Sequence, residues 1–272
     1  MEVNSLFHYL EKIVTDMLAN PGSTKCLYAE DGSRFFKFAS LIFEDMDVKD
    51  PQSLYLREAL RGFRKSYGSR SADVCLYYVF QFIKVAQHLQ PQLLNADLAR
   101  DFRHKGYKSM KGTQLISAEN YASTVDEKST WKQSIFTVLN QTVVISEIHP
   151  ALCDLREQEF WDCLYQLTSV LTFDDIVVGQ GQIEKYCIDV IEKKIGVLHS
   201  ASDVSYRPPI LETFQRALQH YIQHVSPYHG YIESSTMKMK ILTRALDIAS
   251  VVVNIDCFIQ TGRTDNDNVD SL

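Results

Sequence analysis

The feature that most constrains this chain is a run of nineteen residues, 71–89, that contains neither glycine nor proline. Its middle, residues 74–80, is apolar without a break, and apolar residues continue beyond it on most sides. The run is too long for an ordinary strand and predicts a helix. A helix that is apolar nearly all round has no solvent face, so we expect it to cross the middle of a domain. Ser71 is expected to be its N-cap and Asp73 to lie in its first turn, where the helix dipole favours negative charge.

The rest of the chain is predicted to be mainly helical. Apolar residues at helical spacing predict the following helices: 6–18, 38–43, 51–63, 93–102, 130–139, 157–172, 183–195, 210–225 and 236–260. Residues 26–29 and 34–38 flank an Asp-Gly turn at Asp31 and Gly32, which predicts a short β-hairpin. Two further short strands are expected at residues 142–145 and at 174–178.

Composition narrows the class of protein. The chain has 272 residues, 45% of them hydrophobic, which is typical of a globular protein with a substantial core. Its net charge of −6 argues against a nucleic-acid surface. The six cysteines are scattered without a Cys-x-x-Cys pair, which favours reduced thiols in the cytosol. We expect no secretory signal at the N-terminus and no membrane span, because no apolar run approaches about 18 residues.

The domain organisation follows from the distribution of these patterns. Residues 103–123 are basic, rich in Lys, Gly and Ser, and show little periodicity. They are expected to connect two helical halves, joined near residue 110. The last residues, 261–272, carry almost nothing that could pack and are expected to be disordered.

Two glycine-bearing turns precede predicted helices and are the candidate phosphate sites. The first is Gly68-Ser69-Arg70-Ser71, and the second is Gly179-Gln180-Gly181. The N-terminus of a helix can bind phosphate through its free N–H groups and its dipole. Glycines at helix entries are more often steric necessities, however, and neither turn offers the Mg²⁺-binding carboxylate and the cradle that phosphoryl transfer needs.

Other candidate sites are weaker still. His220 and His224 lie at i and i+4 with His229 close behind, a spacing that can hold a metal but commonly arises by accident. The acid pairs Glu44-Asp45 and Asp174-Asp175 stand where polar helix ends are expected. No hydrolase, zinc-protease or Walker motif occurs. On its chemistry alone, the chain is predicted to be an interaction protein and not an enzyme, without a metal or cofactor.

An ordered set of features, however, spans both halves. In the first half these are the breaker at residues 20–22, the hairpin at 25–38, the loop at 46–51 and the glycine turn before the apolar helix. In the second half they are residues 178–184 and the final helix at 237–256. In this order and spacing they resemble the equatorial domain of the group II chaperonins. Residues 160–163, Glu184, Cys187, 206–208 and 244–247 are most similar to the divergent chaperonin-like proteins of Bardet–Biedl syndrome.

The resemblance implies a degenerate nucleotide site. In ATP-hydrolysing members the first turn is Gly-Asp-Gly-Thr-Thr, whose Asp holds Mg²⁺. Here Ser69 replaces that ligand, and Arg70 adds a side chain where a glycine lets the backbone approach phosphate. Gln180 likewise replaces the middle glycine of the second turn. No counterpart of the family's catalytic Asp is found, so neither ATP nor Mg²⁺ is expected as a cofactor.

The resemblance also implies a domain plan. Residues 1–105 and 157–262 would form one equatorial-like domain, mainly α with a small β-hairpin, and 263–272 a disordered tail. The connection at 106–156 would be too short to hold both an intermediate and an apical domain.

The function implied is that of a non-catalytic scaffold or assembly factor. Its partners would be proteins, including other chaperonin-like subunits, in assembly of the ciliary Bardet–Biedl complex. The implied location is the cytoplasm, at the centrosome or the base of the cilium.

Two alternatives remain open from the residues. The first is a nucleotide-binding switch in which Gly68, Ser69, Ser71 and Gly179 still contact phosphate. The second is an unrelated all-α adaptor, in which the two halves would pack as separate bundles.

Overall fold

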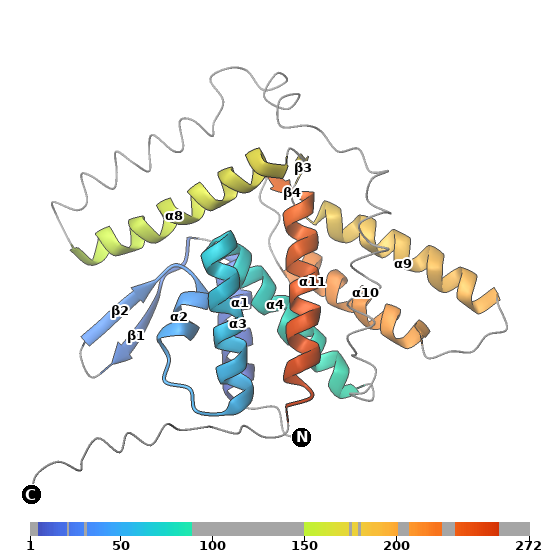
Figure 1. Ribbon diagram of the computed structural model, residues 1–272, viewed down its shortest axis with the longest axis horizontal. Coiled ribbons are helices and arrows are strands. Elements are labelled where there is room, and N and C mark those ends of the chain that lie inside the picture. The colour runs from blue at the N-terminus through green and yellow to red at the C-terminus, as the bar shows by residue number, and fades with distance from the viewer. Residues whose placement is uncertain are drawn as a thin grey trace, which may run out of the picture.

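The protein is mainly α-helical with a small β-hairpin, as predicted (Figure 1). The computed structural model describes residues 5–20, 22–29, 32–88, 150–173, 176–178, 181–200, 207–224 and 232–255. These residues contain eight helices and two two-stranded sheets. The predictions for residues 93–102, 130–139, 142–145 and 263–272, and for most of the connection at 106–156, lie outside them.

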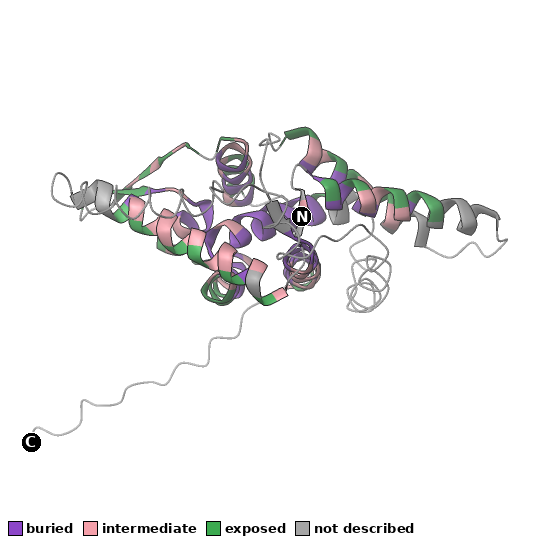
Figure 2. Cartoon of the chain, turned by 90° about the horizontal axis from the view of Figure 1, so that it is seen from above, coloured by how far each residue is buried: buried purple, intermediate pink, exposed green. Residues whose placement is uncertain are grey.

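The apolar run forms helix α4 (Ser69–His88), and it is the centre of the fold. Every residue from 71 to 83 is buried, which confirms a helix without a solvent face (Figure 2). Helices from both halves of the chain surround it: α1 (Ser5–Ala19), α2 (Ala39–Asp45), α3 (Pro51–Tyr67), α8 (Pro150–Phe173), α10 (Arg207–His224) and α11 (Ser235–Val252). A helix apolar on all sides requires neighbours on all sides, and here both ends of the chain supply them.

The two halves share one apolar core. Phe82 of α4 stacks on Phe214 of α10 with ring centroids 5.1 Å apart, and Tyr77 meets Tyr221 edge-on at 5.4 Å. Leu242 of α11 is fully buried in the same cluster. The described helices of the two halves therefore do not form separate bundles.

The beginning of α4 differs from the prediction. The helix starts at Ser69, so Ser71 lies inside its first turn and is not the N-cap. Asp73 does not serve its own helix either. Its buried carboxylate accepts from the N–H groups of Ala39, at 3.0 Å, and Ser40, at 2.8 Å. The N-cap residue of α2, Phe38, has no side-chain acceptor for the free N–H groups at the start of that helix. Asp73 accepts from them instead, although it lies 34 residues after Ala39 in the sequence.

Other boundaries follow local chemistry. Pro51 is at the first position of α3, as predicted, and Asp50 caps it by accepting from the Ser53 N–H at 2.8 Å. Helix α3 continues to Tyr67 because Gly68 ends it. Helix α8 begins at Pro150, earlier than expected, and α11 ends at Val252, earlier than the predicted residue 260.

The predicted hairpin is formed by β1 (Lys25–Ala29) and β2 (Gly32–Phe36), with Ala29 opposite Gly32. Residues 37 and 38 lie outside β2, contrary to the prediction. Strand β3 (Ile176–Val178) forms where expected and pairs with β4 (Ile232–Ser234), which the sequence pattern did not indicate. Helix α9 (Gln182–Ser200) follows β3.

A buried ion pair ties α9 to α11. Glu184 Oε1 lies 2.8 Å from Lys238 Nζ, and the two side chains are 0% and 3% exposed. Tyr78 of α4 donates its hydroxyl to the same Glu184 oxygen at 2.8 Å. Lys238 also donates to the Tyr221 hydroxyl at 3.2 Å. Charges this deep are tolerated only when they are paired and hydrogen-bonded.

Replacing Lys238 with Met should lower the free energy of unfolding by about 3–5 kcal/mol, because Glu184 would remain buried without a cation. Urea unfolding followed by circular dichroism measures this. Lys185→Met, on the exposed side of α9, is the matched control and should change stability by no more than about 0.5 kcal/mol. Adding Glu184→Gln to Lys238→Met should recover much of the loss, and a double variant no better than the single one would contradict the assignment.

Candidate functional site

The first glycine turn is a tight corner between α3 and α4. Gly68 is buried, and its backbone has a φ of 87°, a conformation that residues other than glycine rarely adopt. Its N–H donates to the Arg64 carbonyl at 2.8 Å and so ends α3. Because α4 begins at the next residue, the predicted four-residue turn is reduced to Gly68 alone. Ser69, Arg70 and Ser71 form the first turn of the helix.

Helix α8 covers this corner. Asp162 Oδ1 accepts from the Arg70 N–H at 2.7 Å, and Tyr165 donates its hydroxyl to the Lys65 carbonyl at 3.1 Å. One turn further, Gln166 donates to the Ser71 hydroxyl at 3.1 Å. The N-terminal N–H groups of α4, where a phosphate would be expected, therefore face a carboxylate of the protein itself.

The space at Gly68 is also filled. A Cβ on residue 68 would lie 2.8 Å from Tyr165 Cβ and 2.9 Å from Asp162 Oδ1. Only glycine allows α8 to approach so closely. Gly68 is thus explained by packing and backbone conformation.

The carboxyl groups at this corner have raised pKa values. Burial raises the pKa of Asp162 to about 7, although the Arg70 N–H opposes the shift, and the nearby Asp73 charge adds to it. Burial also raises the pKa of Asp73 to about 6, against the hydrogen bonds from Ser40 and Ala39. The charge of Arg70 lowers both pKa values.

The structure describes only the last residue of the second glycine turn, Gly181. Gly179 and Gln180 lie outside the described residues. Gly181 is buried with a φ of 74°, and a Cβ there would lie 2.9 Å from Ile222 Cγ1 of α10. In the following turn Glu184 is engaged with Lys238. Gly68 is thus covered by α8 and Gly181 by α10.

The histidine pair is engaged in contacts of its own. The rings of His220 and His224 stack with centroids 3.9 Å apart, and His220 Nδ1 is hydrogen-bonded to the Tyr77 hydroxyl. Burial, and then the charge of His224, lower the pKa of His220. His229 lies outside the described residues. Within the described ranges no group of three or more His, Cys, Asp or Glu side chains is placed to hold a metal ion.

Of the two predicted acid pairs, the structure describes only Glu44 and Asp45. Asp174 and Asp175 lie outside the described residues. Glu44 forms a two-pronged ion pair with Arg64, at 2.6 and 2.8 Å, and Asp45 pairs with Arg34 at 2.6 Å. These contacts fix α2 against α3 and β2.

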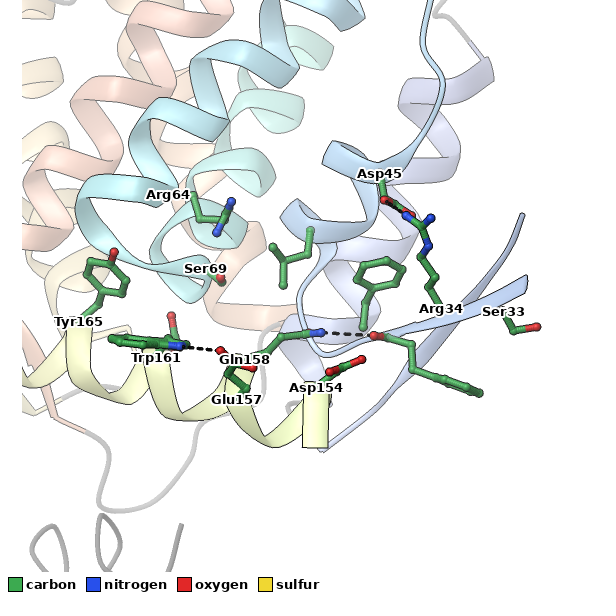
Figure 3. Close-up of a pocket in the computed structure, with 14 residues that line it drawn as sticks. Ser33, Arg34, Asp45, Arg64, Ser69, Asp154, Glu157, Gln158, Trp161 and Tyr165 are labelled. Carbon is green, nitrogen blue, oxygen red and sulfur yellow. Dashed lines mark hydrogen bonds and ion pairs between the residues drawn. The ribbon is translucent and has the colours of Figure 1, made fainter. Parts of the chain in front are cut away.

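A pocket of about 570 Å³, which no sequence motif indicated, opens beside the α4 corner (Figure 3). Ser69 and Asp162 line it at the corner, and β2, α2, α3 and α8 supply the other walls. Three of its residues, Asp154, Glu157 and Trp161, recur at near-helical spacing on α8. That spacing was readable in the sequence, but the opposing wall comes from residues 33–69 and could not be paired with it beforehand.

Comparison of the sequence with models of protein families and with curated proteins found no match in either. The family resemblance therefore stays a proposal.

Gly68→Ala should destabilise the protein by at least about 2 kcal/mol, through strain at positive φ and displacement of α8. Gly62→Ala is the matched control, because Gly62 lies in α3 with nothing within 4 Å of a Cβ. That change should stabilise the protein by about 0.5–1 kcal/mol. Thermal and urea unfolding measure both. Equal effects of the two substitutions would contradict the close contact of α8 with the corner.

Proposed function

We propose that this chain is a non-catalytic, chaperonin-like scaffold or assembly factor. The observation that carries the proposal is the Asp162 carboxylate on the Arg70 N–H, at the helix end where a chaperonin would hold phosphate. A carboxylate in that place repels phosphate and uses the same donor.

The space at the corner supports the same proposal. A triphosphate approaching Gly68 would meet the Tyr165 and Asp162 side chains, which lie within 3 Å of where a Cβ would be. Ser69, in the position of the family's metal ligand, is buried and offers a hydroxyl in place of a carboxylate. Together these features disfavour ATP and Mg²⁺ as cofactors.

Exposed aromatic surface favours binding of protein partners. Trp161 of α8 is 50% exposed and Phe35 of β2 is 42% exposed, and both line the same pocket. Tyr28, on the neighbouring strand β1, is also exposed. Exposed aromatic residues gathered in one region are typical of interaction sites. None of the described helices has the length and apolar character to cross a membrane.

The cellular role proposed comes from the resemblance. The motifs of the chain resemble those of the chaperonin-like proteins of Bardet–Biedl syndrome, in particular the member numbered twelve. By this analogy the partners are chaperonin-like subunits, and the role is assembly of the ciliary complex in the cytoplasm, at the centrosome or cilium base.

A nucleotide-binding switch is the second candidate, and the pocket of about 570 Å³ beside Ser69 favours it. The residues that line the pocket disfavour nucleotide binding, however, because four carboxylates line it and only two guanidinium groups do. Each of these guanidinium groups is already paired with a carboxylate.

The melting temperature should stay within about 1 °C when about 1 mM Mg-ATP is added. A ligand at a hundred times its Kd would add about 2.7 kcal/mol of stability, a shift of several degrees. Differential scanning fluorimetry, with Mg-ADP and Mg²⁺ alone as controls, measures this. A shift of several degrees specific to Mg-ATP would establish the switch instead.

Affinity capture of the tagged chain from ciliated cells tests the cellular part separately. It should recover chaperonin-like or Bardet–Biedl subunits, and a capture that contains none would refute that part alone.

A further inference from the structure

The pocket beside the α4 corner has an acidic floor (Figure 3). Asp154 and Glu157 of α8 line it, and both are exposed. Glu157 accepts a hydrogen bond from the Trp161 indole N–H at 3.2 Å, which holds the carboxylate beside the ring. Within the described residues neither carboxylate takes part in an ion pair. These two carboxylates can therefore pair with a cation of a binding partner.

The basic residues of the pocket do not neutralise this floor. Arg34 is paired with Asp45 at 2.6 Å, and Arg64 with Glu44 at 2.6 Å. The fourth lining carboxylate, Asp162, is held by the first turn of α4. The charge left over in the pocket is negative.

The pocket also has aromatic lining residues that are partly open to solvent, with Trp161 beside Glu157 on α8. Trp161 is 50% exposed and Phe35 is 42% exposed, while Phe36 and Leu41 form a buried and a half-buried wall. Guanidinium groups stack on aromatic faces and pair with carboxylates through a planar fork, whereas an ammonium group is a strongly hydrated point charge. Carboxylates beside an exposed indole therefore favour arginine over lysine.

Contacts of β2 with α8 exclude the addition of a partner strand next to this pocket. Gln158 donates its side-chain amide to the Phe35 carbonyl at 3.3 Å and accepts from the Lys37 N–H at 3.0 Å. The Phe35 carbonyl of β2 and the Lys37 N–H just beyond the strand are thereby occupied. A partner strand cannot add at this point of β2, so a partner would engage the pocket through a side chain.

We propose that this pocket binds an arginine side chain from a basic segment of a partner protein, with an apolar neighbour of that arginine resting on Phe35. This inference rests on the proposed function and identifies the surface through which the scaffold binds its partner. The guanidinium stacks on the exposed face of Trp161 and pairs with the carboxylates of Asp154 and Glu157 beside that ring.

Trp161 itself reports on the binding. The chain has two tryptophans, and Trp131→Phe leaves Trp161 as the only one. The probe is the peptide acetyl-Gly-Gly-Arg-Leu-Gly-Gly-amide, titrated into the full chain while indole emission is followed. The same peptide with citrulline keeps the shape of arginine without its charge, and one with lysine keeps the charge without the planar fork.

The arginine peptide should shift Trp161 emission and bind at least about tenfold more tightly than the citrulline and lysine peptides. Asp154→Asn with Glu157→Gln should weaken its binding about tenfold or more, since each carboxylate makes a charge-assisted contact. Both residues are exposed, so the double variant should remain folded. Asp189→Asn with Glu212→Gln removes two exposed carboxylates from α9 and α10 and should change the affinity less than twofold.

Equal binding of arginine and citrulline peptides, or equal losses in the two double variants, would overturn the proposal. Equal binding of the lysine peptide would overturn the assignment to arginine. Self-association of the chain that Asp154→Asn with Glu157→Gln abolishes would assign the pocket to a second copy. If Mg-ATP binds and displaces the peptide, the proposed function fails while the peptide site stands; if neither ligand binds, only this inference fails.

Discussion

The fold depends on a helix that has no side it can turn to water. Residues 71–83 of α4 are buried all round, so the chain must supply packing partners on every side. Helices α1, α2 and α3 precede α4 in the chain, whereas α8, α10 and α11 come from the second half. The same requirement brings α8 across the beginning of α4, and that contact determines what the candidate site can do.

Carboxylates of the protein take the place of solvent or ligand at two helix ends. Asp73 satisfies the first N–H groups of α2, and Asp162 satisfies that of Arg70 at the start of α4. The charge of Asp73 acts on Asp162, and burial raises the pKa values of both carboxyl groups. A region that resembles a phosphate site in sequence is thus used for internal packing. The open surface lies beside it, where acidic and aromatic residues of α8 face β2.

Local sequence patterns were sufficient for the elements but not for their contacts. The apolar run of α4 and Pro51 at the start of α3 each act over a few residues, and they could be read directly. The hairpin was predicted correctly, but Gly32, which was expected in its turn, lies in β2 opposite Ala29. The role of Asp162 could not be read in this way, because its carboxylate accepts from the Arg70 N–H, 92 residues away in the sequence. Local reasoning likewise assigned Asp73 to its own helix, and only the packing of α2 against α4 shows otherwise.

The most direct test of this account is amide hydrogen exchange at Arg70, measured by nuclear magnetic resonance in the wild-type chain and in Asp162→Ala. First-turn amides of a helix have no intrahelical acceptor and normally exchange quickly. Slow exchange of the Arg70 amide in the wild type and fast exchange in Asp162→Ala, with the buried amides further along α4 unchanged, is the predicted result. Fast exchange at Arg70 in the wild type would mean that α8 does not close this helix end, and would contradict the account.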